Sequence, residues 1–179
     1  MKRISALLPL VILTACAPTT YENPWTNFGV YTYDQEGNKT GDFTRKTGDL
    51  FLKFDPRPDQ INFGVRNDGK ENAFIIWDES TLVYGGGKTS PVMHIGIKYT
   101  DRSNAQKPSV IPPGAYLSEA VIPINLVEWI DGNRYVAGRW IQNNFVVPVE
   151  GSQSILYLVV QDGTGKRTEK FTSIVFKAK

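Results

Sequence analysis

The residues that come nearest to a chemically useful grouping are His94, Lys98, Asp101 and Arg102, which share one short segment. A histidine beside a carboxylate can act as general base for a serine, as in a hydrolase. No Gly-x-Ser-x-Gly motif frames such a serine, so the sequence predicts no catalytic residue. Polar side chains at the end of a strand are typical of binding sites on β-sandwiches. We therefore expect a binding cluster here, and the alternative is a solvated strand edge.

The residue types in the sequence give little indication of a metal site or a cofactor site. The chain has one His and one Cys, which is too few for the usual zinc sites. No Asp-x-Asp-x-Asp spacing suits a hard cation. The run Gly-Gly-Gly-Lys-Thr-Ser at 85–90 lacks the frame of a phosphate loop and is predicted to be a hairpin tip. We expect no metal and no cofactor.

Three tryptophans in the β-rich part, Trp77, Trp129 and Trp140, have two interpretations. Large aromatic side chains dominate the packing of protein cores, which is the interpretation we favour. A row of them exposed across one sheet face would instead suit a cell-wall glycan. A cleft that joins His94 to a serine and a carboxylate would suit a hydrolase.

The N-terminus has the order of features of a secretory signal peptide. Lys2 and Arg3 precede an apolar run at 4–13, and the small residues Thr14 and Ala15 follow it. The run is about half as long as a bilayer span requires, so it is not expected to be a transmembrane helix. An ordinary signal peptide cut near this point would leave a secreted protein with one free thiol.

Leu13-Thr14-Ala15-Cys16 resembles the lipobox of bacterial lipoproteins. The resemblance implies that residues 1–15 are removed, that Cys16 is acylated and becomes the first residue, and that the lipid anchors the protein to a membrane. In enterobacterial-type lipoproteins an Asp after the Cys is the usual signal for retention at the inner membrane. Ala17 stands there instead, which implies the outer membrane facing the periplasm, with the inner membrane as the alternative.

Charge and composition limit the remaining function classes. Removal of 1–15 takes away Lys2 and Arg3, so the formal net charge falls from +2 to 0. No run of like charge remains, so nucleic acid is not an expected partner. An aromatic share of 12% is too high for a disordered chain. Residues 16–28, with two prolines, are predicted to be the lipidated Cys and a short tether, and 29–179 a single domain.

Short β-rich runs separated by turn signals fill that domain. About eight or nine strands without a convincing helix predict an all-β fold, an immunoglobulin-like β-sandwich. The clearest hairpin pairs 155–161 with 167–176. Other predicted strands cover 29–34, 50–54, 61–66, 73–78, 81–84, 92–99, 116–124, 135–141 and 145–149, with 73–78 as a central strand covered on both faces. For 125–130 a helical turn and a strand end both remain open.

The middle of the domain is similar to uncharacterised bacterial lipoproteins with one immunoglobulin-like domain. The similarity rests on Asn67, on Ile-Ile-Trp-Asp at 75–78, on 94–102 and on Ser-Val-Ile-Pro-Pro-Gly at 109–114. It supports the sandwich and implies no reaction. We therefore expect a non-enzymatic envelope lipoprotein that binds or scaffolds another protein. The alternative is a cell-wall glycan binder or hydrolase that uses the tryptophans or the His94 cluster.

Overall fold

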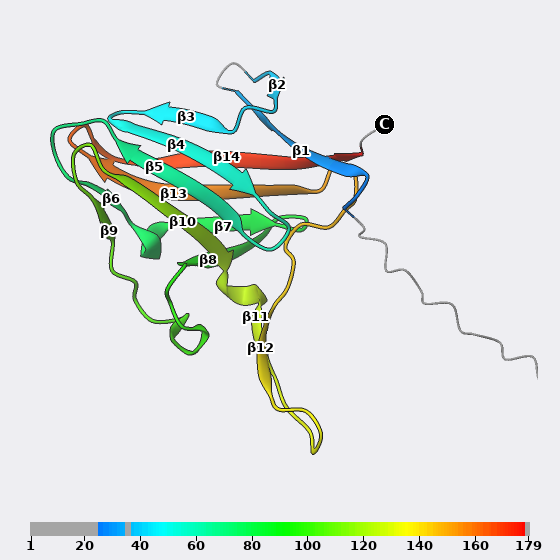
Figure 1. Cartoon of the computed structure of the whole chain (residues 1–179). Coiled ribbons are helices and arrows are strands. Elements are labelled where there is room, and N and C mark those ends of the chain that lie inside the picture. Colours follow the sequence, from blue (N-terminus) through cyan, green and yellow to red (C-terminus); the bar gives the residue numbers. More distant parts are fainter. Residues whose placement is uncertain (1–24, 35–36, 178–179) are drawn as a thin grey trace, which may run out of the picture.

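A computed structural model describes residues 25–34 and 37–177, which form an all-β, sandwich-like fold (Figure 1). The predicted fold class is confirmed. The strands are β1 (Phe28–Tyr33), β2 (Lys39–Thr40), β3 (Thr44–Thr47), β4 (Leu50–Pro56), β5 (Ile61–Asn67), β6 (Ala73–Ile75), β7 (Thr81–Tyr84), β8 (Lys88–His94), β9 (Ser109–Ile111), β10 (Tyr116–Pro123), β11 (Val127–Ile130), β12 (Arg139–Gln142), β13 (Gln153–Asp162) and β14 (Gly165–Lys177). The described helices are three short 3-10 turns, η1 (Trp77–Glu79), η2 (Tyr99–Asp101) and η3 (Ile124–Leu126).

The two layers of the sandwich are joined by hydrogen bonds through β8. The strands follow one antiparallel path, β2-β1-β14-β13-β7-β8-β10-β5-β4-β3, with β6 beside β13 and β9 beside β6. The first half of β8 pairs with β7, so that Thr81 lies opposite Pro91. Its last residues pair with β10, where Val121 lies opposite His94. Strand β8 therefore passes from one layer to the other, and β11 and β12 form a separate small sheet.

The main core lies between the layers. Phe54 of β4 stacks on Phe171 of β14 at 4.2 Å between ring centroids. Burial alternates along β4 and β13, as expected for strands that cover a core with one face. The predicted hairpin of 155–161 with 167–176 is confirmed as the β13–β14 pair. A second, smaller cluster consists of Met93, Ile122 and Val127, on the opposite face of β8 and β10 from the main core.

Four predicted strands differ from the structure, and the one predicted at 135–141 begins only at Arg139, as β12. The strand predicted at 73–78 ends at Ile75, because Ser80 hydrogen-bonds back to Ile76 and Trp77 and turns the chain into η1. The strand predicted at 92–99 ends at His94, because Gly96 adopts a φ of +96° that no strand continues. Residues 145–149 form no strand, because the backbone amides of Phe145 and Val146 both donate to the carbonyl of Pro58.

Strands β2 and β3 were not predicted, because their sequences Lys-Thr and Thr-Arg-Lys-Thr carry no apolar alternation. Within residues 25–34 and 37–177 no helix has the length and apolar character needed to cross a bilayer. Cys16 and the predicted signal peptide lie outside the described residues.

Candidate functional site

His94 faces the inside of the sandwich, away from the three residues predicted to accompany it. Its ring stacks on Trp77 at 4.6 Å, with an interplanar angle of 15°. Its Nδ1 atom is buried without a hydrogen bond and lies 3.6 Å from Oε1 of Glu119 on β10. Burial raises the pKa of the Glu119 carboxyl, and the proximity of His94 opposes part of that rise. The predicted cluster of four residues does not form around His94.

Gln106 fixes the loop that leaves His94 and returns to the sandwich. Its side chain donates to the carbonyl of Val92 at 2.7 Å and accepts from the backbone amide of His94 at 3.3 Å. Its own backbone amide donates to Oδ1 of Asp78 at 2.9 Å. In the described part of the chain the buried Nδ1 atom of His94 has no serine as a hydrogen-bond partner.

The other three predicted residues lie on the loop 95–102. Lys98 and Asp101 are exposed. Arg102 lies over the ring of Trp140, 4.7 Å from its centroid, and donates to the carbonyl of Tyr99 at 2.9 Å. The structure therefore brings Arg102 to a tryptophan of the small sheet rather than to His94.

The three tryptophans do not form one row. Trp77 is only 1% exposed and belongs to the main core. Trp129 and Trp140 lie opposite each other on β11 and β12, with ring centroids 5.5 Å apart. Gly138 leaves room for the Trp129 ring, which a Cβ at that position would overlap. The expected core position is correct for Trp77, whereas Trp129 lies on the surface.

Strands β11 and β12 with the loop between them, residues 127–142, project from the body of the molecule (Figure 1). We call this element the projecting hairpin. Its base is held by Val127 in the second cluster and by Gln142, which accepts from the Tyr99 hydroxyl at 3.1 Å and donates to the carbonyl of Asp59 at 2.6 Å. The loop 95–102 covers this base through Tyr99 and Arg102.

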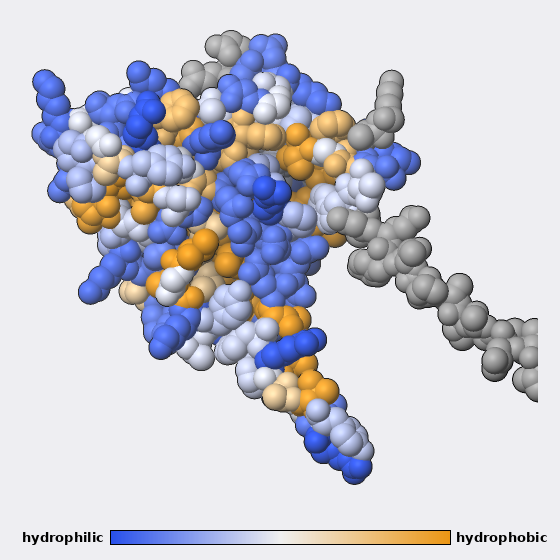
Figure 2. All heavy atoms as spheres, viewed as in Figure 1, coloured by the Kyte–Doolittle hydropathy of each residue, from blue (hydrophilic) through white to orange (hydrophobic). Residues whose placement is uncertain are grey.

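The outer part of the projecting hairpin exposes large apolar and aromatic side chains (Figure 2). The exposed fractions are 49% for Trp129, 44% for Ile130, 78% for Tyr135 and 56% for Val136. Exposed apolar side chains gathered on one element are typical of interaction sites. The sequence contained a signal for this feature that our prediction did not use, since Tyr135 and Val136 are large residues within a turn-rich loop.

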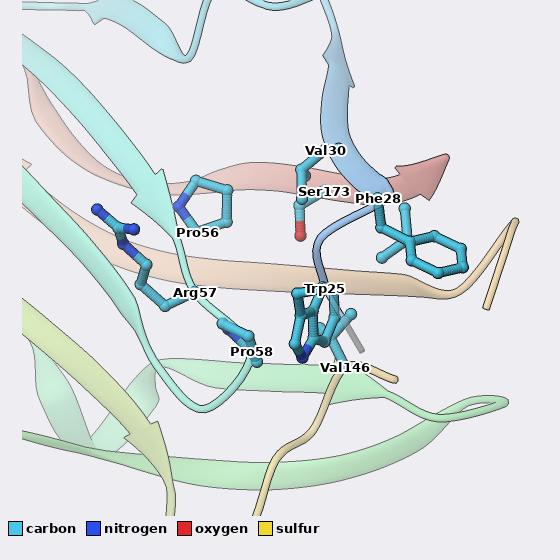
Figure 3. Close-up of a pocket in the computed structure, with 10 residues that line it drawn as sticks. Trp25, Phe28, Val30, Pro56, Arg57, Pro58, Val146 and Ser173 are labelled. Atoms are coloured by element: carbon cyan, nitrogen blue, oxygen red, sulfur yellow. The ribbon is translucent and has the colours of Figure 1, made fainter. Parts of the chain in front are cut away.

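An apolar pocket of about 260 Å³ lies where the described chain begins (Figure 3). Trp25 and Phe28 line it together with Val30, Pro58 and Val146. The sequence left open whether Trp25 and Phe28 pack on the domain, and in the structure both pack against the main core. The Arg57 guanidinium points away from Trp25 and pairs with Asp55 at 2.8 Å. The pocket is therefore lined mainly by apolar side chains, with few polar groups.

No group of three or more His, Cys, Asp or Glu side chains in the described ranges is placed to hold a metal ion.

Comparison with known proteins adds little to these observations. No family model and no curated protein matches the sequence. A solved structure described as Northeast Structural Genomics Consortium target SoR45 is 9% identical, with a TM-score of 0.32 over 84% of this chain and 83% of that chain. A similarity this low carries no inference about fold or function.

Proposed function

We propose that this chain is a lipid-anchored envelope lipoprotein that binds another folded protein through the projecting hairpin. The anchor is Cys16, which the lipobox resemblance marks for acylation, and the place is the periplasmic side of the outer membrane, with the inner membrane as the alternative. The exposed aromatic and apolar residues of the hairpin are the observation that carries the binding role.

The composition of the hairpin supports a protein partner. Trp, Tyr and Arg are the residues that contribute most binding energy at protein interfaces. The hairpin exposes Trp129 and Tyr135, and its exposed cations are Arg134 and Arg139. Arg134 lies over the Tyr135 ring at 4.5 Å, so an aromatic surface and a cation are presented together.

A lipid surface fits the hairpin less well. Glu128 and Asp131 lie among its apolar residues and are exposed. Asp131 accepts a hydrogen bond from the indole nitrogen of Trp129 at 2.8 Å, so the carboxylate would enter the bilayer with the ring. A carboxylate within the hydrocarbon region costs about 2.5 to 3.5 kcal/mol, whereas a protein interface can pair it.

A glycan platform also has less support. Sugar rings stack on open aromatic faces, and Arg102 covers a face of Trp140 while Gly138 lies under Trp129. A hydrolase would require a nucleophile beside His94, whose ring contacts Trp77 and the carboxylate of Glu119. Both classes remain outcomes of the experiment that follows.

The experiment places a photo-crosslinking amino acid at position 135 of the membrane-anchored, full-length protein in intact cells. Tyr116 is the matched control, because it is also an exposed tyrosine but lies on β10 of the sandwich. We expect one discrete protein adduct from position 135, absent from position 116, and lost when Trp129→Ser is added. Adducts to lipid or glycan, or equal labelling from both positions, would contradict the proposal.

A further inference from the structure

The strongest unused feature is the pair formed by His94 and Glu119, at the point where β8 ends. Only 17% of the His94 side chain and 12% of the Glu119 side chain are exposed. The buried Nδ1 atom has no hydrogen-bond partner, and the Glu119 Oε1 atom lies 3.6 Å away. An unpaired polar atom in a buried position is uncommon and calls for a reason.

The surroundings of this pair contain few other charges. On η1, the Trp77 ring stacks on the His94 ring, and the Asp78 carboxylate accepts a hydrogen bond from the backbone amide of Gln106. From the returning loop comes the neutral side chain of Gln106. From β5 the residue opposite Glu119 is Phe63. On the described elements that pack against His94, Glu119 is therefore the charged group that faces the imidazole directly.

The loop that follows His94 connects this pair to the base of the projecting hairpin. Gly96, with its φ of +96°, turns the chain out of β8. Ile97 and Tyr99 then pack on the second cluster, and the Tyr99 hydroxyl donates to Gln142 of β12. Arg102 continues the contact by lying over Trp140. The segment 95–102 thus bridges the pair and the hairpin.

We propose that protonation of the His94–Glu119 pair controls how firmly loop 95–102, and with it the base of the projecting hairpin, is held to the sandwich. Its consequence for partner binding rests on the proposed function, but the conformational effect does not. The device would make the binding surface responsive to the pH of the compartment.

The proton balance is simple. A neutral imidazole has one N–H, so Nδ1 can be without a hydrogen, as its missing partner suggests. One proton taken from solvent gives hydrogens to both ring nitrogens, and Nδ1 then donates to the Glu119 carboxylate across a short gap. Such a charge-assisted hydrogen bond is about twice as strong as a neutral one. It links the last residue of β8 to the middle of β10, where the loop departs.

The direction of the effect follows from the same chemistry. Burial raises the pKa of Glu119 in the folded state, so its contribution to stability is complete at low pH and is lost as the pH rises through that value. The pair shares one added proton between Nδ1 and the facing carboxyl oxygen, so the same bridge is complete at low pH and is lost at high pH. The loop should therefore be held more firmly at about pH 5.5 than at about pH 8.

The test is hydrogen–deuterium exchange of the full-length protein in detergent micelles at these two pH values, with rates corrected for intrinsic exchange. We expect peptides from 95–108 and 127–142 to exchange at least about threefold faster at the higher pH, while the β13–β14 peptides do not change. Glu119→Gln keeps the shape of the side chain and should abolish the difference. Glu150→Gln, at an exposed glutamate outside the two measured peptides, should leave it intact.

Persistence of the difference in Glu119→Gln, or equal exchange of the loop at both pH values in the wild type, would overturn the inference. His94→Gln is a second variant with the same expectation, so the result does not depend on one substitution. Crosslinking from position 135 at both pH values separates the two proposals. If exchange depends on pH but no protein adduct forms, this inference is supported and the proposed function is contradicted. If an adduct forms but exchange does not depend on pH, the proposed function is supported and this inference is contradicted.

Discussion

At the scale of single residues, the Asp162 side chain at the end of β13 accepts several hydrogen bonds. Its side chain is fully buried and accepts from Arg167 at 2.7 and 2.9 Å, from Thr164, and from the backbone amide of Asp49 at 3.0 Å. These donors hold the pKa of the Asp162 carboxyl well below its usual range. The network ties the β13–β14 turn to the turn before β4, between residues far apart in the chain.

Asp162→Asn is predicted to destabilise the domain, because it removes the buried carboxylate that pairs with Arg167 and leaves only Glu169, 3.3 Å from Nε, as a counter-charge. Removing one partner of such a pair costs about 3 kcal/mol, or a Tm lower by roughly 5–10 °C at neutral pH. Since the folded pKa of Asp162 is depressed, its contribution is present above the unfolded pKa of about 3.9 and lost as the pH falls below it. Thermal unfolding from pH 7 down to pH 2 measures both effects.

The control for this prediction is Asp68→Asn, because Asp68 pairs with Arg66 at 2.6 Å on the surface, where both side chains are well exposed. Its Tm should stay close to that of the wild type, since exposed ion pairs contribute little. A similar loss of Tm in both variants, or a wild-type advantage that stays constant down to pH 2, would contradict this account of Asp162.

At the scale of elements, the projecting hairpin depends on two glycines for a tight loop. A Cβ on Gly132 would lie 2.5 Å from the carbonyl oxygen of Val136 and would overlap the backbone amide of Gly138. These are backbone atoms, which cannot swing aside as the end of a side chain can. The hairpin is also a two-stranded unit, which has little stability of its own.

Gly132→Ala should therefore disorder the outer part of the projecting hairpin while the sandwich remains folded. We expect loss of the photo-crosslink from position 135 and a change in tryptophan fluorescence, with a Tm within a few degrees of the wild type. Gly41→Ala is the control, because a Cβ at Gly41 meets no atom within 4 Å. An unchanged crosslink in Gly132→Ala would show that the loop geometry is not required for binding.

Prediction of the elements succeeded where apolar alternation and turn residues agree, as in β4, β5 and the β13–β14 hairpin. It failed at 92–99 for a physical reason. Ile95, Ile97 and Tyr99 continue the alternation of β8, but Ile97 and Tyr99 reach the second cluster from a loop after Gly96 has turned the chain. Hydrophobic periodicity predicts which residues are buried against apolar neighbours. It does not predict whether those residues lie on a strand or in a loop.

At the scale of the whole molecule, we expect the predicted anchor and the fold to be separable, because the buried residues of the main core lie between Leu50 and Val175. Cys16→Ser should abolish acylation and membrane association without changing the fold of the domain. Intact mass of the membrane-extracted wild type should equal the chain from Cys16 plus its acyl groups, and fractionation should show the variant's failure to mature. Near-UV circular dichroism of wild type and variant should agree.

A wild-type protein recovered soluble and without acyl chains would contradict the lipoprotein prediction. It would leave a secreted β-domain with a free thiol at Cys16, and the proposed partner would then have to be sought outside the membrane fraction.

The sequence by itself determined the all-β class and most of the strand positions, because alternation and turn residues are local properties. It also determined the expectation of a lipidated Cys16, which rests on four adjacent residues. Only the tertiary structure decided that His94 faces Glu119, that Arg102 meets Trp140 and that residues 127–142 project from the body. These relations depend on which strands become neighbours and in what register, and that choice is made by the packing of residues far apart in the chain.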